Sequence, residues 1–246
     1  MDSKTLQNFA LPGAGYGYTG TNVNDLTSSE NTIVTGLIDQ SGSTTSFWGE
    51  IEKCIQQIIH SLRHCPASDK LMYRHCHFDT DFVEVHGFKP LSDCHEDDYK
   101  GIYSGGGQTA LYNSCDKILR STLDYAAQQA SKRYTVNGIN FIITDGMDYL
   151  SSGKNLTPND VKKTLEEVNS SEVLESLITI LIGVNKEPSV RKGLEAFHKA
   201  AGFTQFIEIE NADERTLAKL AKFISESVSS QSQALGTGGP SQSLTF

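Results

Sequence analysis

The feature that most constrains this chain is a regular alternation of short apolar runs with longer segments of helical periodicity. Between the runs, apolar side chains recur every three or four residues, as in 47–65 and 109–130. Strands that alternate with helices favour a mainly parallel sheet covered by helices on both faces. The six runs of strand character are 31–39, 70–78, 82–88, 138–145, 176–184 and 203–210.

One pair of runs departs from this alternation. Only Asp79-Thr80-Asp81 separates 70–78 from 82–88, and this connection is too short for a crossover between parallel strands. The sequence therefore predicts a hairpin at this point, inside an otherwise parallel α/β sheet of the doubly wound kind. In such sheets, ligands bind at the carboxyl ends of the strands, near a switch in strand order.

The chain of 246 residues is long enough for one α/β domain with tails. Residues 1–30 are rich in Gly, Asn, Thr, Ser and Tyr without a regular period, so we expect an N-terminal tail or loosely packed arm. Residues 31–229 form the predicted domain. Residues 230–246 are rich in Gly, Ser and Gln, and we expect a flexible C-terminal tail.

Charge and composition narrow the classes of partner. The formal net charge of −9 disfavours the phosphate backbone of nucleic acids and anionic membrane surfaces. No apolar run approaches the ~18 residues of a membrane span, and the first residues carry no secretory signal. The five cysteines follow no zinc-like spacing. We therefore expect reduced thiols and a cytoplasmic location, with neither nucleic acid nor membrane as a partner.

Oxygen-bearing side chains follow the ends of two buried runs and one glycine-rich loop. Asp39, Ser41 and Ser43 come after the first run, Asp145 ends the fourth, and Thr109 follows a loop with three glycines. If the sheet is doubly wound, all five lie at its carboxyl edge. Two carboxylates and three hydroxyls are hard oxygen ligands, which suit Mg²⁺ or Mn²⁺ rather than zinc. A single such motif is often only a helix cap, but three that converge favour a metal site.

These motifs, in this order, resemble the metal-ion-dependent adhesion site of the von Willebrand factor A domain. The resemblance rests on Asp-x-Ser-x-Ser at 39–43, a glycine-rich loop with threonine at 105–109, and Thr-Asp-Gly at 144–146, and it covers about residues 31–229. The loop Gly-Gly-Gly-Gln-Thr is longer than the family's usual Gly-Gly-Thr. The resemblance implies a Rossmann-like, mostly parallel six-stranded sheet with one antiparallel edge strand and helices on both faces.

The resemblance also implies roles for the five side chains. Ser41, Ser43 and Thr109 would coordinate the cation directly or through water, while Asp39 and Asp145 would act largely through water. One coordination position then stays open for an Asp or Glu of a protein partner. The implied function is an intracellular protein-binding module rather than an enzyme. By analogy with intracellular relatives, the partner would belong to a multi-protein assembly, such as an AAA+ ATPase or a component of a stress or defence system.

Two other functions compete with this interpretation. A metal on such a sheet could assist phosphate hydrolysis, although the three motifs contain neither a general base nor a Lys or Arg clamp. Alternatively, the chain is a scaffold subunit with an unused metal site. Ser104 and Asp148 are further possible helpers of the cation. The acidic loop at 93–98 lacks the spacing of an EF-hand, so we expect it to be solvated.

The histidines offer one more candidate site. His75 and His77 alternate along a predicted strand and therefore share one face, where they could bind zinc together with His60, His64 or Cys65. No paired ligand motif accompanies them, so ordinary half-buried polar residues are the better interpretation.

Overall fold

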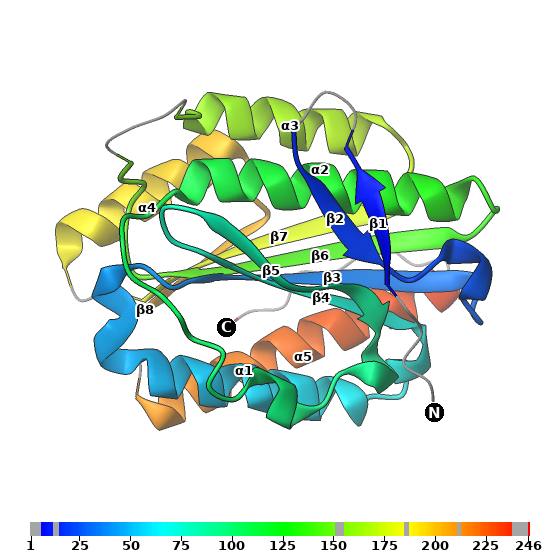
Figure 1. Ribbon diagram of the computed structural model, residues 1–246, viewed down its shortest axis with the longest axis horizontal. Coiled ribbons are helices and arrows are strands. Elements are labelled where there is room, and N and C mark those ends of the chain that lie inside the picture. Colours follow the sequence, from blue (N-terminus) through cyan, green and yellow to red (C-terminus); the bar gives the residue numbers. More distant parts are fainter. Residues whose placement is uncertain (1–5, 12–14, 151–154, 185–186, 211–212, 238–245) are drawn as a thin grey trace.

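The computed structural model describes residues 6–11, 15–150, 155–184, 187–210, 213–237 and 246. Its centre is one eight-stranded sheet with the order β1-β2-β5-β4-β3-β6-β7-β8 (Figure 1). The strands are β1 (Gln7–Ala10), β2 (Gly17–Gly20), β3 (Glu30–Asp39), β4 (Leu71–Phe78), β5 (Phe82–Pro90), β6 (Thr135–Thr144), β7 (Ser176–Val184) and β8 (Gln205–Ile209).

The predicted pattern of strand directions is confirmed in the middle of the sheet. β3 pairs in parallel with β4 and β6, and β7 pairs in parallel with β6 and β8. β4 and β5 form the predicted antiparallel hairpin. β3, the first strand of the predicted domain, lies in the middle of the sheet. β4 and β5 follow on one side of it, and β6, β7 and β8 follow on the other. The carboxyl ends of β3 and β6 therefore lie side by side at one edge of the sheet.

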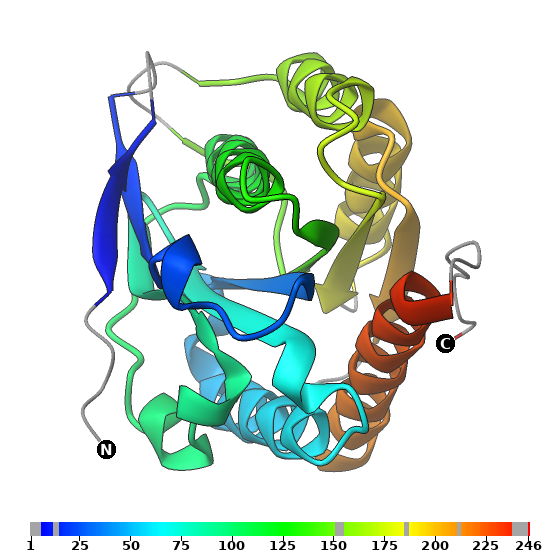
Figure 2. The ribbon, with the colours of Figure 1, turned by 90° about the vertical axis from the view of Figure 1, so that its right-hand side faces the viewer.

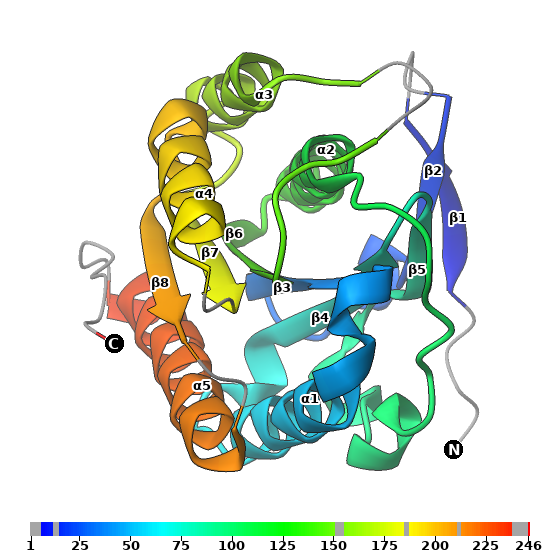
Figure 3. The same ribbon diagram turned by 90° about the vertical axis from the view of Figure 1, so that its left-hand side faces the viewer.

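Five α-helices cover the two faces of this sheet, as predicted (Figure 3). One face carries α1 (Trp48–Arg63) and α5 (Glu214–Thr237), and the other carries α2 (Leu111–Ala130), α3 (Pro158–Ser170) and α4 (Pro188–Ala201). α3 begins with Thr157 accepting a hydrogen bond from the backbone of Asp160 and with proline in its first turn, which is a favourable start for a helix. None of the described helices combines the length and apolar character that a membrane crossing requires.

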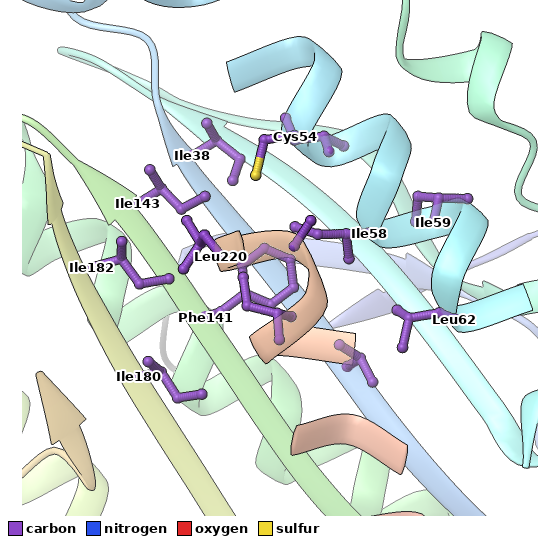
Figure 4. Packing of buried hydrophobic residues seen from close by; sticks show 14 of the residues in the cluster. Ile38, Cys54, Ile58, Ile59, Leu62, Phe141, Ile143, Ile180, Ile182 and Leu220 are labelled. Atoms are coloured by element: carbon purple, nitrogen blue, oxygen red, sulfur yellow. The ribbon is translucent and has the colours of Figure 1, made fainter. Parts of the chain in front are cut away.

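Each central strand is buried on both faces because its side chains alternate between two cores. Ile38, Phe141 and Ile180 belong to the cluster that contains α1 and α5 (Figure 4). The neighbouring Leu37 and Ile142 belong to the cluster under α2, α3 and α4. This double burial explains why these strands appear in the sequence as continuous apolar runs rather than as alternating ones.

The prediction of six strands and of an antiparallel edge strand is wrong in one respect. Residues 7–10 and 17–20, within the segment expected to be a tail or arm, form an antiparallel hairpin of two further strands. β2 pairs with β5 in parallel at Gly20 and Phe88, so β5 is not an edge (Figure 2). Each strand is only four residues long, and β2 begins and ends with glycine, so their sequences carry no detectable alternation.

Aromatic packing attaches this hairpin to the domain. The Tyr18 ring is 3% exposed, stacks on Phe9 with centroids 5.1 Å apart, and meets the edge of Phe88 at 5.8 Å. Its hydroxyl donates a hydrogen bond of 2.7 Å to Asp124 on α2. The hairpin therefore contributes buried apolar area to the core, which a loose arm would not.

The C-terminal segment predicted to be flexible from residue 230 begins inside a helix. α5 continues to Thr237, and Gln231 and Ser232 are buried. The side chain of Asn137, near the start of β6, donates to the carbonyl of Gln231 at 3.0 Å. The prediction for residues 238–245 falls outside the described residues.

Candidate metal centre

The two aspartates of the predicted site meet because their strands are neighbours in the sheet. β3 ends at Asp39, and Asp145 follows the last residue of β6. The parallel register pairs Ile38 with Ile143, so both chains leave the sheet at the same level and on the same edge. Asp39 is fully buried and Asp145 is 6% exposed. Neighbouring strand ends thus bring together two carboxylates that are 106 positions apart in sequence.

A continuous set of hydrogen bonds connects four of the five predicted ligands. Asp39 Oδ1 accepts a hydrogen bond of 2.8 Å from the Ser41 N–H, and the Ser41 and Ser43 hydroxyl oxygens are 3.2 Å apart. Ser43 Oγ donates to Asp145 Oδ1 at 2.8 Å. The turn at 42–47 is a short 3-10 helix, which brings the Ser43 side chain to both Ser41 and Asp145. The hydroxyl and carboxylate oxygens therefore lie within one small volume.

The glycine-rich loop brings the fifth predicted ligand, Thr109, to the same edge. The Gly106 N–H donates to the Gln40 carbonyl at 3.0 Å. A Cβ on Gly105 would lie 1.9 Å from that same carbonyl oxygen, so only glycine permits this approach. Thr109 is 7% exposed, and its Oγ1 lies 3.9 Å from the position that a Cβ on Gly146 would occupy. Its side chain is thus beside the turn that follows Asp145.

Burial shapes the electrostatics of both carboxyl groups. The pKa of Asp39 is raised to about 6, mainly by desolvation and to a smaller extent by the nearby charge of Asp145, against hydrogen bonds from Ser41 and Thr144 that lower it. Desolvation also raises the pKa of Asp145, although its hydrogen bond from Ser43 opposes the shift. The charged forms are therefore disfavoured in this place, and a cation between them would offset that cost.

The donor set fits a small hard cation. In the part of the chain that the structure describes, no three His, Cys, Asp or Glu side chains gather into a metal-binding group. A cation here would consequently rely on hydroxyl oxygens and water as well as on carboxylates. Mg²⁺ accepts this arrangement because it is commonly bound by one or two carboxylates and keeps several waters. The residues that would hold it are those predicted: Asp39, Ser41, Ser43, Thr109 and Asp145.

Two residues that sequence reasoning left without a role complete the surroundings. Thr144 Oγ1 donates to Asp39 Oδ2 at 2.6 Å and accepts from the Gly146 N–H at 3.2 Å. Gln40 lies between Asp39 and Ser41 and is only 2% exposed. Thr144 belongs to the Thr-Asp-Gly motif, and its place before a strand-end aspartate was the available signal. Gln40 had no such signal, because a polar residue in a turn is usually solvated.

The alternative sites are not assembled. His75 and His77 share a buried face of β4, with Nε2 atoms 2.9 Å apart. His60 on α1 and His64 just after its end are exposed, and His64 Nδ1 contacts the His60 carbonyl. The zinc site that would combine the two pairs is therefore not formed. Asp148, a possible helper of the cation, instead accepts a hydrogen bond from the N–H of Tyr112 in the first turn of α2, at 2.9 Å.

Comparisons with known proteins identify the fold but not a family. No family model and no curated protein matches this sequence. Among solved structures, the PilB minor pilin from Streptococcus sanguinis is similar over 87% of this chain and 64% of its own, with 12% identity and a TM-score of 0.60. Proximal thread matrix protein 1 from the mussel byssus is similar over 81% of this chain and 46% of its own, with 14% identity and a TM-score of 0.55.

A third similar structure carries the fold name in its description. The ArnB paralog VWA2 from Sulfolobus acidocaldarius is similar over 80% of this chain and 45% of its own, with 13% identity and a TM-score of 0.50. The chain therefore has a fold like that of the von Willebrand factor A domain. It spans less than two thirds of the length of these three proteins, and identities this low concern the fold alone.

Proposed function

We propose that this chain is a protein-binding module that holds one divalent cation, Mg²⁺ by preference, and grips a carboxylate of its partner through that cation. The observation that carries the proposal is the hydrogen-bonded set of Asp39, Ser41, Ser43 and Asp145 oxygens at the carboxyl edge of the sheet. Interaction modules are one established use of a fold of this type, and the hard-oxygen set supplies the chemistry.

The proposed binding step follows from the charges of the site. Two carboxylates neutralise a divalent cation, and the hydroxyls of Ser41, Ser43 and Thr109 are neutral. The protein groups do not fill the six positions that Mg²⁺ prefers. Ser43 is exposed while the other four ligands are buried, so the accessible side of the site lies at the turn that contains Ser43. An Asp or Glu side chain of the partner would approach from that side.

We propose binding rather than catalysis because the oxygen set lacks the groups that hydrolysis needs. The five proposed ligands include no Lys or Arg that could clamp a phosphate, and the side chains of Ser43 and Thr144, which donate to Asp145 and Asp39, are hydroxyls that do not take up a proton readily. All five cysteines are free thiols, and four are buried, which accords with the proposed cytoplasmic location within a multi-protein assembly.

The first test is thermal unfolding of the wild-type chain in EDTA and in Mg²⁺, Mn²⁺ or Ca²⁺. Binding to the folded state alone stabilises it by about 2.7 kcal/mol at a metal concentration one hundred times Kd. We expect Mg²⁺ and Mn²⁺ to raise Tm in the wild type and to leave Tm of Asp145→Asn unchanged. Asp81→Asn is the matched control, since Asp81 is an exposed aspartate in the neighbouring hairpin turn.

Capture experiments then separate the three functions. Partner capture that requires Mg²⁺ and is lost in Asp145→Asn supports the module. Capture that survives both EDTA and this variant indicates a scaffold whose metal site is unused. Mg²⁺-dependent turnover of a phosphate ester that is lost in Asp145→Asn indicates an enzyme. A wild-type Tm that no cation changes, even at millimolar concentration, contradicts the proposed metal site.

A further inference from the structure

We infer that Gln40 is a positioning residue of the metal centre, held by a one-directional chain of hydrogen bonds that begins at Tyr73 inside the sheet. The inference rests on the proposed function, because the loops that Gln40 connects carry the proposed ligands. Gln40 itself would not touch the cation. Its contribution would be to fix the loop of Thr109 against the loop of Asp39 and Ser41.

The chain runs along β4 toward the carboxyl edge of the sheet. The Tyr73 hydroxyl lies 2.7 Å from His75 Nδ1, and His75 Nε2 lies 2.9 Å from His77 Nε2. His77 Nδ1 lies 3.2 Å from Gln40 Oε1, and Gln40 Nε2 lies 3.2 Å from Asp79 Oδ2. The first four side chains are at most 2% exposed, so water does not compete for these bonds.

The partners at the outer end determine where every proton lies. A carboxylate only accepts, so the Gln40 amide donates to Asp79 and its oxygen faces His77. An amide oxygen also only accepts, so His77 carries its proton on Nδ1 and accepts at Nε2. His75 must then donate from Nε2 and accept from Tyr73 at Nδ1. The two neutral histidines are therefore held in opposite tautomers, and each bond depends on the one before it.

Burial agrees with this assignment. Desolvation lowers the pKa of His77 to about 4 and lowers that of His75 well below its ordinary value. Both imidazoles are consequently neutral near pH 7, and each has one donor and one acceptor nitrogen. A second proton on His77 would sit on Nε2 and face the Nε2–H of His75, and a second proton on His75 would sit on Nδ1 and remove the acceptor of the Tyr73 hydroxyl, so the chain disfavours both.

Gln40 connects three loops through its side chain and its carbonyl group. The carbonyl accepts from the Gly106 N–H at 3.0 Å, and the side chain reaches Asp79 in the turn between β4 and β5. The turn between β4 and β5 also holds the loop of Thr109. The Asp79 carbonyl accepts from the Ala110 N–H at 2.8 Å, and Thr80 Oγ1 accepts from the Gln108 N–H at 2.9 Å. Both routes from Gln40 therefore lead to Thr109.

A charge exchange between Gln40 and Asp79 tests the inference. Gln40→Glu keeps the size of the side chain and its bond from His77, but it sets two carboxylates against each other at Asp79. Asp79→Asn alone replaces a carboxylate, which only accepts hydrogen bonds, by an amide, which both accepts and donates. The double variant Gln40→Glu with Asp79→Asn restores one donor and one acceptor in reversed order. His86→Phe is the control for ring packing, because His86 lies beside Tyr73 and His75, with ring centroids 5.6 and 6.2 Å away, but contacts Tyr99 at 2.7 Å and makes none of the hydrogen bonds of the chain.

The first measurement is Mg²⁺ affinity from titrations of Tm. Groups that orient metal ligands typically change affinity about 10- to 100-fold when they are altered. We expect Gln40→Glu to lose affinity in this range, the double variant to recover most of it, and His86→Phe to bind as the wild type does. Equal Mg²⁺ affinity in Gln40→Glu and the wild type overturns the positioning role.

Two measurements without metal keep this inference separate from the proposed function. Long-range nitrogen–proton NMR should show the Nδ1–H form of His77 and the Nε2–H form of His75; the reverse pair overturns the chain. Amide hydrogen exchange at Gln108 and Ala110 should be faster in Gln40→Glu and slow again in the double variant. If the wild type shows no response to Mg²⁺, the proposed function fails, and unchanged exchange at these amides overturns the positioning role independently.

Discussion

Two carboxylates in this molecule, one partly buried and one fully buried, are accommodated in different ways. Glu84, on β5 beneath the N-terminal hairpin, contacts the fully buried guanidinium of Arg74 at 2.6 Å and accepts from the Thr19 N–H at 2.8 Å. Asp39, at the end of β3, accepts from the Ser41 N–H and the Thr144 hydroxyl, both of which are neutral. Glu84 thus has a cation from the chain itself, and Asp39 has dipoles.

The two regions therefore differ in how the charge of the carboxylate is stabilised. The Arg74 guanidinium also lies over the rings of Tyr18 and Phe88, at 5.6 and 5.4 Å, so its charge is part of the packing that holds the hairpin. At Asp39 the charged form is costly, which the raised pKa of about 6 expresses. In the first region, the guanidinium of Arg74 stabilises the carboxylate of Glu84 without any bound ion. In the second region, a bound cation would stabilise the carboxylate of Asp39.

We expect the largest loss of stability when the guanidinium of Arg74 is removed. Arg74→Met leaves Glu84 largely buried without its charge partner, and breaking such a pair costs about 3–5 kcal/mol. We expect this loss in the free energy of unfolding measured by urea denaturation. Arg120→Met is the control: that guanidinium is 39% exposed in its pair with Asp116, and exposed pairs contribute about 1 kcal/mol or less. Equal losses in both variants would remove the distinction.

The second prediction concerns the pH dependence of Asp39 in EDTA. Its folded-state pKa of about 6 lies above the ordinary 3.8, so the folded protein binds this proton more tightly and loses stability as the pH rises from about 4 to 6. Asp39→Asn should therefore be more stable than the wild type at pH 8, by about 3 kcal/mol for a shift of about two pKa units.

This advantage should shrink to a small remainder near pH 4, where the wild-type carboxyl is protonated in the folded state and about half protonated in the unfolded state. Urea denaturation at a series of pH values measures it. With saturating Mg²⁺ at pH 8 we expect the stability advantage of Asp39→Asn over the wild type to shrink or reverse, since only the wild type would gain from the cation. A difference between the two proteins that is the same at pH 4 and pH 8 would contradict the electrostatic account of Asp39.

We expect the smallest change in stability from a variant that tests how the N-terminal hairpin is attached to the domain. Tyr18→Phe keeps the stacked ring and removes the hydroxyl that donates to Asp124 and accepts from Gln128 at 3.0 Å. The expected cost is about 1 kcal/mol in urea denaturation. Tyr149→Phe serves for comparison, because the Tyr149 side chain is 67% exposed and its loss of a hydroxyl should be neutral. A cost close to zero for Tyr18→Phe would mean that the ring alone attaches the hairpin.

The elements of the domain could be predicted because their sequences carry local signals. The strand at Ser176–Val184 has the predicted limits, and the helices begin and end within a few residues of expectation until α5. Repeated burial on both faces produces apolar runs, and the short link at 79–81 demands a hairpin. The helix α5 extends beyond its predicted end at residue 229, because its last turns use polar residues such as Gln231 that no hydrophobic period reveals.

The proposed metal centre could be predicted in its composition and only partly in its arrangement. The strand ends place Asp39 and Asp145 together once the sheet order is known, and the DxSxS spacing places the serines beside them. The role of Gln40 was not visible, because its partners His77 and Asp79 belong to another strand and turn. A hydrogen bond between side chains 37 or 39 positions apart leaves no mark on local periodicity.

The class of fold, the order of its central elements and the oxygen side chains of the proposed metal centre could be read from the sequence alone, because hydrophobic periodicity and turn chemistry are local properties. It takes the tertiary structure to show that residues 7–10 and 17–20 join the sheet, that β5 is not an edge and that Arg74 is balanced by Glu84. Those outcomes depend on which surfaces remain to be covered after the domain has folded. That is a property of the packed molecule and not of any one segment.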